Sequence, residues 1–504
     1  MSKIFRVLFI ILIVFSLNTN LGNILWAADA TPITNVILDT DMGADDWMSI
    51  LWLLNQKNIN VKAITICTDG EAISPCGAQN ATILAKLVKG DSSIKIYNGK
   101  KQKPIAFSKM DPKHPIQSAH TASGSKDRLA YSFPKVIRSS ASTDMKNITG
   151  LKGCSGYAYE KDISAAQAIF SFAIEASNND NPLTIISTGT ATNIAEAFMI
   201  AQHNNQVDKF IHGIKMIYKG GGAFGLECNK DILKPTHFYL SMRNSKANSN
   251  QGPSCHGDLS AITERTAKEE ALRNQKSEHN VARDKNRLTY NSSFITNLNI
   301  PGNLNIGGIY ATNNTTAEWN IYTAAESMQK VLNSGLPVTF IPLNVSNIVK
   351  ITKESFDRLR KEGGKLGKIV ANIIYQAWVS QQGGWAIAGG QLDYWDPSVV
   401  ITALHPEIIL EGKTYKTKLC VNLKNPSYSK YPNGLFTYYG PNGTMNYRMF
   451  TPVKGKFSSF YYGTTIVDCD SDCKSVGNLS PKEATVIMGI NPDALFNVFI
   501  DGLK

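Results

Sequence analysis

An apolar run that ends among four aspartates constrains the fold of this 504-residue chain more than any other feature. Residues 36–38 are typical of a short buried strand, Gly43 lets the backbone turn, and residues 47–55 continue as an apolar helix. The acids lie at the strand end and in the first turn of the helix, at Asp39, Asp41, Asp45 and Asp46. A strand that passes directly into a helix indicates an alternating α/β fold.

The four carboxylates at this junction need a compensating charge. Anions this close repel one another by several kcal/mol in a dry cleft unless a cation or protons neutralise them. Hard oxygen ligands suit Ca²⁺ or Mg²⁺, so the cluster favours a metal site. The alternative is helix capping, because aspartate is common at N-cap and first-turn positions. Capping accounts for Asp45 or Asp46 but not for all four acids.

Strand and helix patterns alternate along much of the chain. Strands are expected at 61–67, 183–187, 214–218 and 337–343, and helices at 78–88, 163–176, 194–202, 324–334 and 398–404. The fold class predicted is α/β, a mostly parallel, doubly wound sheet flanked by helices. The ligand site of such a sheet lies outside the carboxyl ends of its strands, where Asp41 and Asp69 fall.

Two segments interrupt this alternation. Residues 101–160 are polar and irregular, and residues 225–305 contain a charged run that indicates a partly helical insertion. Residues 412–480 are rich in Tyr, Asn, Gly, Lys and Pro, which predicts β-hairpins at the edge of the same domain. We therefore expect residues 31–504 to form a single domain.

The first thirty residues have the pattern of an export signal. A basic start precedes the apolar segment 7–15, and residues 28–30 offer a small-x-small cleavage site. The apolar stretch is short for a membrane span, and the alternative is an uncleaved N-terminal anchor. We expect residues 1–30 to be a signal peptide and the mature protein to be exported, either secreted or periplasmic, without a membrane partner.

Eight cysteines are compatible with disulfides in an exported chain. Spacing makes Cys228 with Cys255, and Cys469 with Cys473, the first pairs to test. Cys67 falls in an apolar strand pattern and is expected to be a buried thiol. The chain has no CxxC pair, which argues against a structural zinc site.

The net charge of +12 is dispersed along the chain. Dispersed Lys and Arg are typical of a solvated surface, and no basic stripe or nucleic-acid motif accompanies them. We therefore expect no nucleic-acid partner.

Further motifs stand beside the predicted strands and helices. Glycines 220–222 would let a ligand approach the backbone, and residues 188–193 can present a carbonyl to a cation. Glu318 and Asn320 share one side if the backbone is extended and could hold hydroxyl groups, or they form an ordinary surface pair. Asp396 is either the N-cap of a following helix or a fifth carboxylate for the metal.

The motifs and their order resemble the nucleoside hydrolase family, calcium-dependent enzymes that cleave the N-glycosidic bond of ribonucleosides. The matching segments are residues 39–46, Thr192-Asn193, Gly221-Gly222-Ala223-Phe224, residues 317–322 and Trp395-Asp396-Pro397. The resemblance spans roughly residues 35–410, with a looser echo at 491–496, which would be the closing helix. It implies that the domain is catalytic and acts on a small-molecule ribonucleoside; a homo-oligomer is compatible with the sequence.

The resemblance assigns a role to each acid of the cluster. The family's Ca²⁺ ligands match Asp41, Asp46, the backbone carbonyl of Thr192, and Asp396. Asp41 would also be the general base for a calcium-bound water that attacks C1′ of the ribose. The positions that hold the ribose hydroxyls match Asp45, Glu318 and Asn320. Asp39 would orient its neighbours.

Trp395 bears on the leaving group. Many family members carry His at this position, and a tryptophan cannot donate the proton that an imidazolium would. Its ring can stack on a purine instead, which makes N7 easier to protonate. Cys67-Thr68-Asp69 also resembles the purine-preferring inosine-adenosine-guanosine branch, which implies a purine bias and a base contact from Asp69. The alternative for Asp69 is a turn residue before Gly70.

Two departures from the family pattern leave alternatives open. The ribose-contacting Asn upstream of Glu318 has no gap-free match, and the second stacking aromatic of the purine branch has none in an obvious place, although Tyr131, Phe133 or Tyr157 could replace it. One alternative is a hydrolase that prefers pyrimidines or accepts any base. The other is a calcium-bound nucleoside- or ribose-binding protein with weak catalysis.

Overall fold

The computed structural model describes residues 34–71, 75–90, 94–100, 159–224, 318–379, 392–423 and 479–504, with Gly463 and the short elements at 435–439, 445–449, 465–467 and 472–475. The expected signal peptide, the insertion at 225–305 and the three candidate aromatics between 131 and 157 lie outside these residues. Cys228, Cys255 and Cys469 lie outside them as well.

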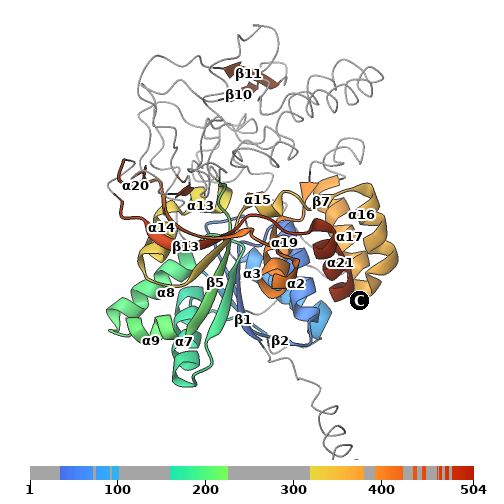
Figure 1. Cartoon of the computed structure of the whole chain (residues 1–504). Helices are drawn as coiled ribbons and strands as arrows, with labels where there is room; N and C mark the ends of the chain where they lie inside the picture. Colours follow the sequence, from blue (N-terminus) through green and yellow to red (C-terminus); the bar gives the residue numbers. More distant parts are fainter. Residues whose placement is uncertain are drawn as a thin grey trace, which may run out of the picture.

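A nine-stranded sheet forms the centre of the described fold (Figure 1). In spatial order its strands are β12 (Thr465–Val467), β9 (Thr414–Val421), β13 (Lys482–Ile487), β6 (Val338–Ile341), β5 (Ile214–Gly220), β4 (Leu183–Ser187), β1 (Thr34–Thr40), β2 (Ile59–Ile66) and β3 (Lys95–Asn98). Neighbours from β13 to β3 are parallel, whereas β9 pairs antiparallel with both β13 and β12. The predicted mostly parallel sheet is confirmed.

Helices cover both faces of the sheet (Figure 1). One face carries α2 (Ala44–Asn55), α3 (Cys76–Lys89), α16 (Lys353–Glu362), α17 (Gly364–Ile374), α19 (Trp395–Leu404) and α21 (Pro492–Leu503). The other carries α7 (Ala165–Asn178), α8 (Thr192–His203), α9 (Val207–His212), α13 (Trp319–Thr323) and α14 (Ala325–Asn333). Val36 and Leu38 of β1 pack into the first core and Ile37 into the second. Because both faces are buried, the strand sequence is continuously apolar.

The remaining described elements are short. They are α15 (Leu343–Ser346), β7 (Lys350–Ile351), the π-helical turn η4 (Tyr375–Val379), β8 (Leu392–Asp393), the 3₁₀ turn η6 (Pro406–Ile408), β10 (Leu435–Tyr439), β11 (Met445–Met449) and α20 (Asp472–Ser475). β10 and β11 pair antiparallel with each other, apart from the main sheet. No helix within the described ranges is long and apolar enough to span a bilayer.

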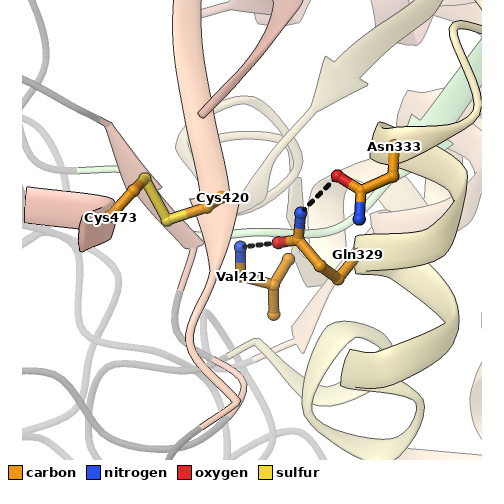
Figure 2. The surroundings of a disulfide bond; sticks show 5 residues. All are labelled: Gln329, Asn333, Cys420, Val421 and Cys473. Carbon is orange, nitrogen blue, oxygen red and sulfur yellow. Dashed lines mark hydrogen bonds between the residues drawn. A yellow bond between two sulfur atoms is a disulfide. The ribbon is translucent and has the colours of Figure 1, made fainter. Parts of the chain in front are cut away.

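A disulfide anchors the antiparallel edge of the sheet. Cys420 of β9 is bonded to Cys473 of α20, and on the other side of β9 the N–H of Val421 donates to Oε1 of Gln329 in α14 at 2.8 Å (Figure 2). The expected pairing of Cys473 with Cys469 is therefore wrong, because the fold brings a cysteine 53 residues away closer than spacing suggests. Cys67 is a buried free thiol, as predicted.

The direction in which the chain crosses the sheet reverses between β1 and β4. From β1 the chain continues to β2 and β3 on one side, and later to β4, β5 and β6 on the other. Ligands of doubly wound sheets bind in the crevice at such a switch point, outside the carboxyl ends of the strands. Residues 41–46 and 188–193 directly follow the ends of β1 and β4.

Candidate functional site

Three carboxylates from two helices converge at the switch point. Asp45 and Asp46 lie in the first turn of α2, and Asp396 lies in the first turn of α19. One oxygen from each lies within 4.8 Å of the others, and none of the three residues is more than 9% exposed. The N-cap of α19 is Tyr394, so capping does not explain Asp396. Enclosed hard oxygen ligands at this spacing fit a divalent cation such as Ca²⁺.

Asp41 is held between two glycine-containing loops beside this trio. A Cβ on Gly70 would lie 2.1 Å from Cβ of Asp41, and a Cβ on Gly189 would lie 2.6 Å from its backbone nitrogen. The Asp41 carboxylate also accepts a hydrogen bond from the N–H of Glu71 at 3.2 Å. Only glycine permits such a close approach at these two positions. The loops after β2 and β4 therefore fix the position of Asp41.

Asp46 combines capping with its place in the cluster. One carboxylate oxygen accepts from the N–H of Gly43 at 2.8 Å, and the other from the hydroxyl of Thr188 at 2.6 Å. Met42 makes the preceding turn with a φ of 64°, and its carbonyl accepts from the indole N–H of Trp47 at 3.1 Å. The capping alternative is thus correct for Asp46. Each of its carboxylate oxygens still has a second lone pair, so the capping bonds do not prevent Asp46 from binding a cation.

Burial and mutual repulsion raise the pKa values of Asp41, Asp45 and Asp396. Desolvation first, and then the charge of Asp46, raises the pKa of Asp45 to about 7. The pKa values of Asp41 and Asp396 lie well above the usual range, again through desolvation first and then through neighbouring carboxylates. The ionised cluster is costly without a counter-charge, so a cation would bind in competition with protons.

Glu71 is a further acid of this site that sequence reasoning missed. Its charge raises the pKa of both Asp41 and Asp396. Its Oε2 lies 2.8 Å from the position of a Cβ on Gly43. The available signal was its place two residues after Asp69, just beyond the end of the strand next to β1.

Asp39 joins three elements behind the cluster. Its carboxylate accepts hydrogen bonds from Thr65 at 2.7 Å, from the Asn193 amide at 2.9 Å and from the Cys67 thiol at 3.4 Å. Its carbonyl accepts from the N–H of Thr188 at 2.8 Å. Burial raises the pKa of Asp39 to about 6, while these donors oppose the shift. Asp39 therefore connects β1 with β2 and with the loop before α8.

Asp69 lies in the turn after β2 and binds the loop that contains Thr192. Its two carboxylate oxygens accept from the hydroxyls of Thr190 at 2.7 Å and of Thr192 at 2.5 Å. Thr192 begins α8, and its carbonyl is the ligand that the family resemblance implies. The sequence offered two roles for Asp69, a contact with the base of the substrate and a turn residue before Gly70. Neither role accounts for these two hydrogen bonds.

Glu318 caps a helix that the sequence did not predict. Its carboxylate accepts from the backbone N–H groups of Asn320 at 2.9 Å and Ile321 at 3.0 Å at the start of α13, and from Gly222 at 3.2 Å. The extended conformation considered for this segment is therefore wrong, because a capping carboxylate satisfies the first N–H groups of a helix. The surface-pair alternative is wrong as well, since Glu318 is 3% exposed.

The turn after β5 accommodates this carboxylate. Gly221 and Gly222 have φ values of 137° and 84°. A Cβ on Gly221 would lie 2.6 Å from Oε2 of Glu318. These glycines therefore serve both a left-handed backbone and the approach of an acid.

The side-chain oxygen of Asn320 is an acceptor that meets no donor in the described part of the chain. Its Nδ2 donates to the carbonyl of Thr188 at 2.7 Å, whereas its buried Oδ1 receives no hydrogen bond from the described residues. A buried acceptor without a partner costs about 1–3 kcal/mol, so such atoms usually meet a ligand or water. A hydroxyl group of a sugar is a donor of the required kind.

Trp395 uses its polar atom on the protein. The indole N–H donates to Oδ1 of Asn347 at 2.5 Å, and the half-buried ring packs near Ala223 and Leu343. What the ring can offer a ligand is therefore an aromatic surface and not a proton.

Two bacterial ribonucleoside hydrolases are similar in sequence to part of this chain. A putative pyrimidine-specific ribonucleoside hydrolase, RihB, of Shigella boydii is 29% identical over 112 residues, which are 22% of this chain and 46% of that protein. The pyrimidine-specific RihB of Escherichia coli is 28% identical over 112 residues, 22% of this chain and 35% of that protein. The match thus spans less than half the length of these relatives.

Solved structures share the fold. An inosine-uridine preferring nucleoside hydrolase from Bacillus anthracis is similar with a TM-score of 0.52 at 15% identity, over 94% of this chain and 99% of that one. A plant nucleoside hydrolase is similar with a TM-score of 0.50 at 14% identity, over the same shares. The family model of the inosine-uridine preferring nucleoside hydrolases matches residues 36–497, and the chain belongs to this family.

Proposed function

We propose that this protein hydrolyses the N-glycosidic bond of ribonucleosides with the help of Ca²⁺, and that it prefers purine nucleosides. The observation that carries the proposal is the meeting of two features at the switch point of the sheet. One is the trio Asp45, Asp46 and Asp396, and the other is Oδ1 of Asn320, to which none of the described residues donates. The first suits a cation and the second suits a sugar hydroxyl.

The residues that would hold the cation are Asp41, Asp46, Asp396 and the Thr192 carbonyl. When bound, Ca²⁺ would neutralise the acids and supply a Lewis acid that lowers the pKa of a water molecule. Hydrogen bonds from Gly43 and Thr188 already orient the Asp46 carboxylate. The carbonyl of Asp39 accepts from the N–H of Thr188 and so helps to hold the residue that orients Asp46.

Asp41 would act as the general base. Its carboxylate takes a proton from the water as the water oxygen bonds to C1′ of the ribose. The bond between C1′ and the base nitrogen breaks, and the base leaves with the electron pair and takes up a proton from solvent, which balances the proton that Asp41 accepts. The transition state resembles an oxocarbenium ion, which the surrounding acids stabilise. Contact with Gly70 and Gly189 keeps the Asp41 carboxylate in place.

The ribose would be recognised through its hydroxyl groups. Asn320 offers Oδ1, Asp45 offers a carboxylate of the trio, and Glu318 holds Asn320 by accepting its backbone N–H. A deoxynucleoside would leave buried polar atoms unpaired, so discrimination against it should be strong.

Two readings of base preference have support. The indole N–H of Trp395 is bonded to Asn347, so the ring would act on the base by stacking and not by donating a proton. Stacking on a purine ring favours purine nucleosides. A preference for pyrimidines is the second candidate, and the names of the Shigella and Escherichia relatives favour it.

Release of free base from inosine, adenosine, guanosine, uridine and cytidine tests these points, with Ca²⁺ and after chelation. Calcium-dependent release from purines alone supports the whole proposal. Release from pyrimidines retains the hydrolase and rejects the purine bias. No release from any substrate by calcium-loaded protein leaves a nucleoside-binding protein.

Substitution Asp41→Asn tests the general base in the same assay. We expect loss of turnover with the fold retained. The matched control is Asp208→Asn, an exposed aspartate in the first turn of α9, which should leave turnover unchanged. Full activity of Asp41→Asn would reject Asp41 as the base.

We also propose that the protein is exported. The Cys420–Cys473 disulfide supports this, since such bonds persist in oxidising compartments. Protease protection of the protein in intact cells, compared with lysed cells, would test the location.

A further inference from the structure

A buried lysine stands behind the candidate site without a part in the proposed reaction. Lys219, near the end of β5, is 1% exposed. Burying an ammonium group is costly unless it is paired and hydrogen-bonded. Its Nζ donates to the carbonyl of Gly189 at 2.5 Å and to the carbonyl of Gly220. A lysine at this position therefore has a specific set of partners.

These two carbonyls belong to the two segments that hold the sugar-binding residues. Gly189 follows Thr188, whose carbonyl accepts from the side chain of Asn320. Gly220 opens the turn in which the N–H of Gly222 donates to Glu318. One ammonium group thus joins the loop after β4 to the turn after β5, and each of them binds one end of the segment 318–320.

Charge supports the same connection. Lys219 lowers the pKa of Glu318, which burial otherwise raises, and it acts likewise on Asp39. The lysine therefore favours the ionised form of the carboxylate that caps α13. An apolar residue of the same length would remove both the tether and this counter-charge.

We infer that Lys219 is a positioning residue for recognition of the ribose. It fixes the spacing between the loop at 188–190 and the turn at 220–222, so that Oδ1 of Asn320 meets a hydroxyl of the sugar. The inference rests on the proposed function, because it names a determinant of that same site. It assigns Lys219 contact with neither the substrate nor the cation.

The test is Lys219→Met, which keeps the length of the side chain and removes its charge and donors. The matched control is Lys215→Met on the same strand, where the lysine is exposed. The substrates are inosine and its 2′-, 3′- and 5′-deoxy analogues, with kcat/KM measured for each. Titration calorimetry with Ca²⁺ alone checks that the cation site of each variant is intact.

Lys219→Met should lower kcat/KM for inosine by about 30-fold or more and should change the Ca²⁺ affinity by less than about threefold. For at least one deoxy analogue the loss should shrink to below about threefold, because the hydroxyl that Lys219 helps to recognise is already missing. Lys215→Met should match the wild type. An equal loss on all four substrates, or no loss on inosine, would overturn the inference.

Two further outcomes have defined meanings. If Lys219→Met does not fold, Lys219→Gln takes its place; because its shorter side chain retains an amide donor, the criterion is then only that the loss on inosine exceeds the loss on at least one deoxy analogue. If the wild type releases no base, the proposed hydrolysis is wrong, and the inference is then judged by the dissociation constants of inosine and its analogues. Equal constants for wild type and variant would overturn it.

Discussion

Substitution Glu318→Gln should strongly destabilise the protein although it only replaces one carboxylate oxygen by an NH₂ group. The carboxylate of Glu318 is 3% exposed and accepts three backbone hydrogen bonds. One oxygen serves Asn320, and the other serves Ile321 and Gly222. Glutamine has a single acceptor, so one of these oxygens becomes an NH₂ group that faces an N–H donor.

The magnitude follows from the bonds that change. With the amide oxygen facing Ile321 and Gly222, the bond from Asn320 is lost, and a hydrogen bond to a charged group contributes about 1.5–3 kcal/mol. The two retained bonds lose the assistance of the charge, which is about half of their strength, or about 1 kcal/mol each. The buried Lys219 also loses a counter-charge. We expect the free energy of unfolding to fall by about 3–5 kcal/mol.

Denaturant unfolding of the two proteins, with and without Ca²⁺, measures this difference. A lower midpoint with an unchanged slope would show a loss of stability and not a change in the unfolded state. The control is Glu354→Gln, an exposed acid in the first turn of α16, which should cost less than about 1 kcal/mol. A loss below 1 kcal/mol for Glu318→Gln would refute the capping argument.

Three other perturbations have defined outcomes. Gly70→Ala would place a Cβ 2.1 Å from that of Asp41, which we propose as both the base and a Ca²⁺ ligand, so we expect at least about a 100-fold loss of turnover and weaker Ca²⁺ binding by calorimetry; an active variant would contradict the close contact. Burial raises the pKa of Asp45 to about 7, so the metal-free native state binds more protons than the unfolded chain between about pH 4 and 7 and loses stability as pH rises through that range. The increase in melting temperature on adding Ca²⁺ should therefore be larger at pH 8 than at pH 5, and equal increases would count against a carboxylate site. Replacing Cys420 and Cys473 by alanine opens a link across 53 residues and should cost about 2–4 kcal/mol in denaturant unfolding, whereas an unchanged midpoint would speak against the bond.

The sequence was sufficient for the central strands of the sheet because they are buried on both faces, whereas β3 and β13 were not expected as strands. Such strands are short apolar runs between turn residues, and the expected strand at 183–187 coincides with β4. The helix expected at 324–334 corresponds to α14 within a residue at each end. Periodicity is a strong signal where the whole element packs into a core.

The site was predictable only where chemistry and position coincide in the sequence. Four aspartates at one strand end indicate a cation site at once, whereas Glu318 with Asn320 fits both an extended segment and a capped helix. The pairing of Cys473 with Cys420 and the partners of Lys219 depend on strand order, which local patterns do not contain.

Thr188 explains why the cation half and the sugar half of the site form one unit. Its N–H donates to the carbonyl of Asp39, its hydroxyl to Asp46, and its own carbonyl accepts from Asn320. Its bonds reach both an acid of the cluster and the amide proposed to bind the sugar. Because Thr188 directly follows β4 at the switch point, the rigid sheet sets the spacing between the two halves. The precision of the site therefore comes from the strand ends together with the loops that directly follow them.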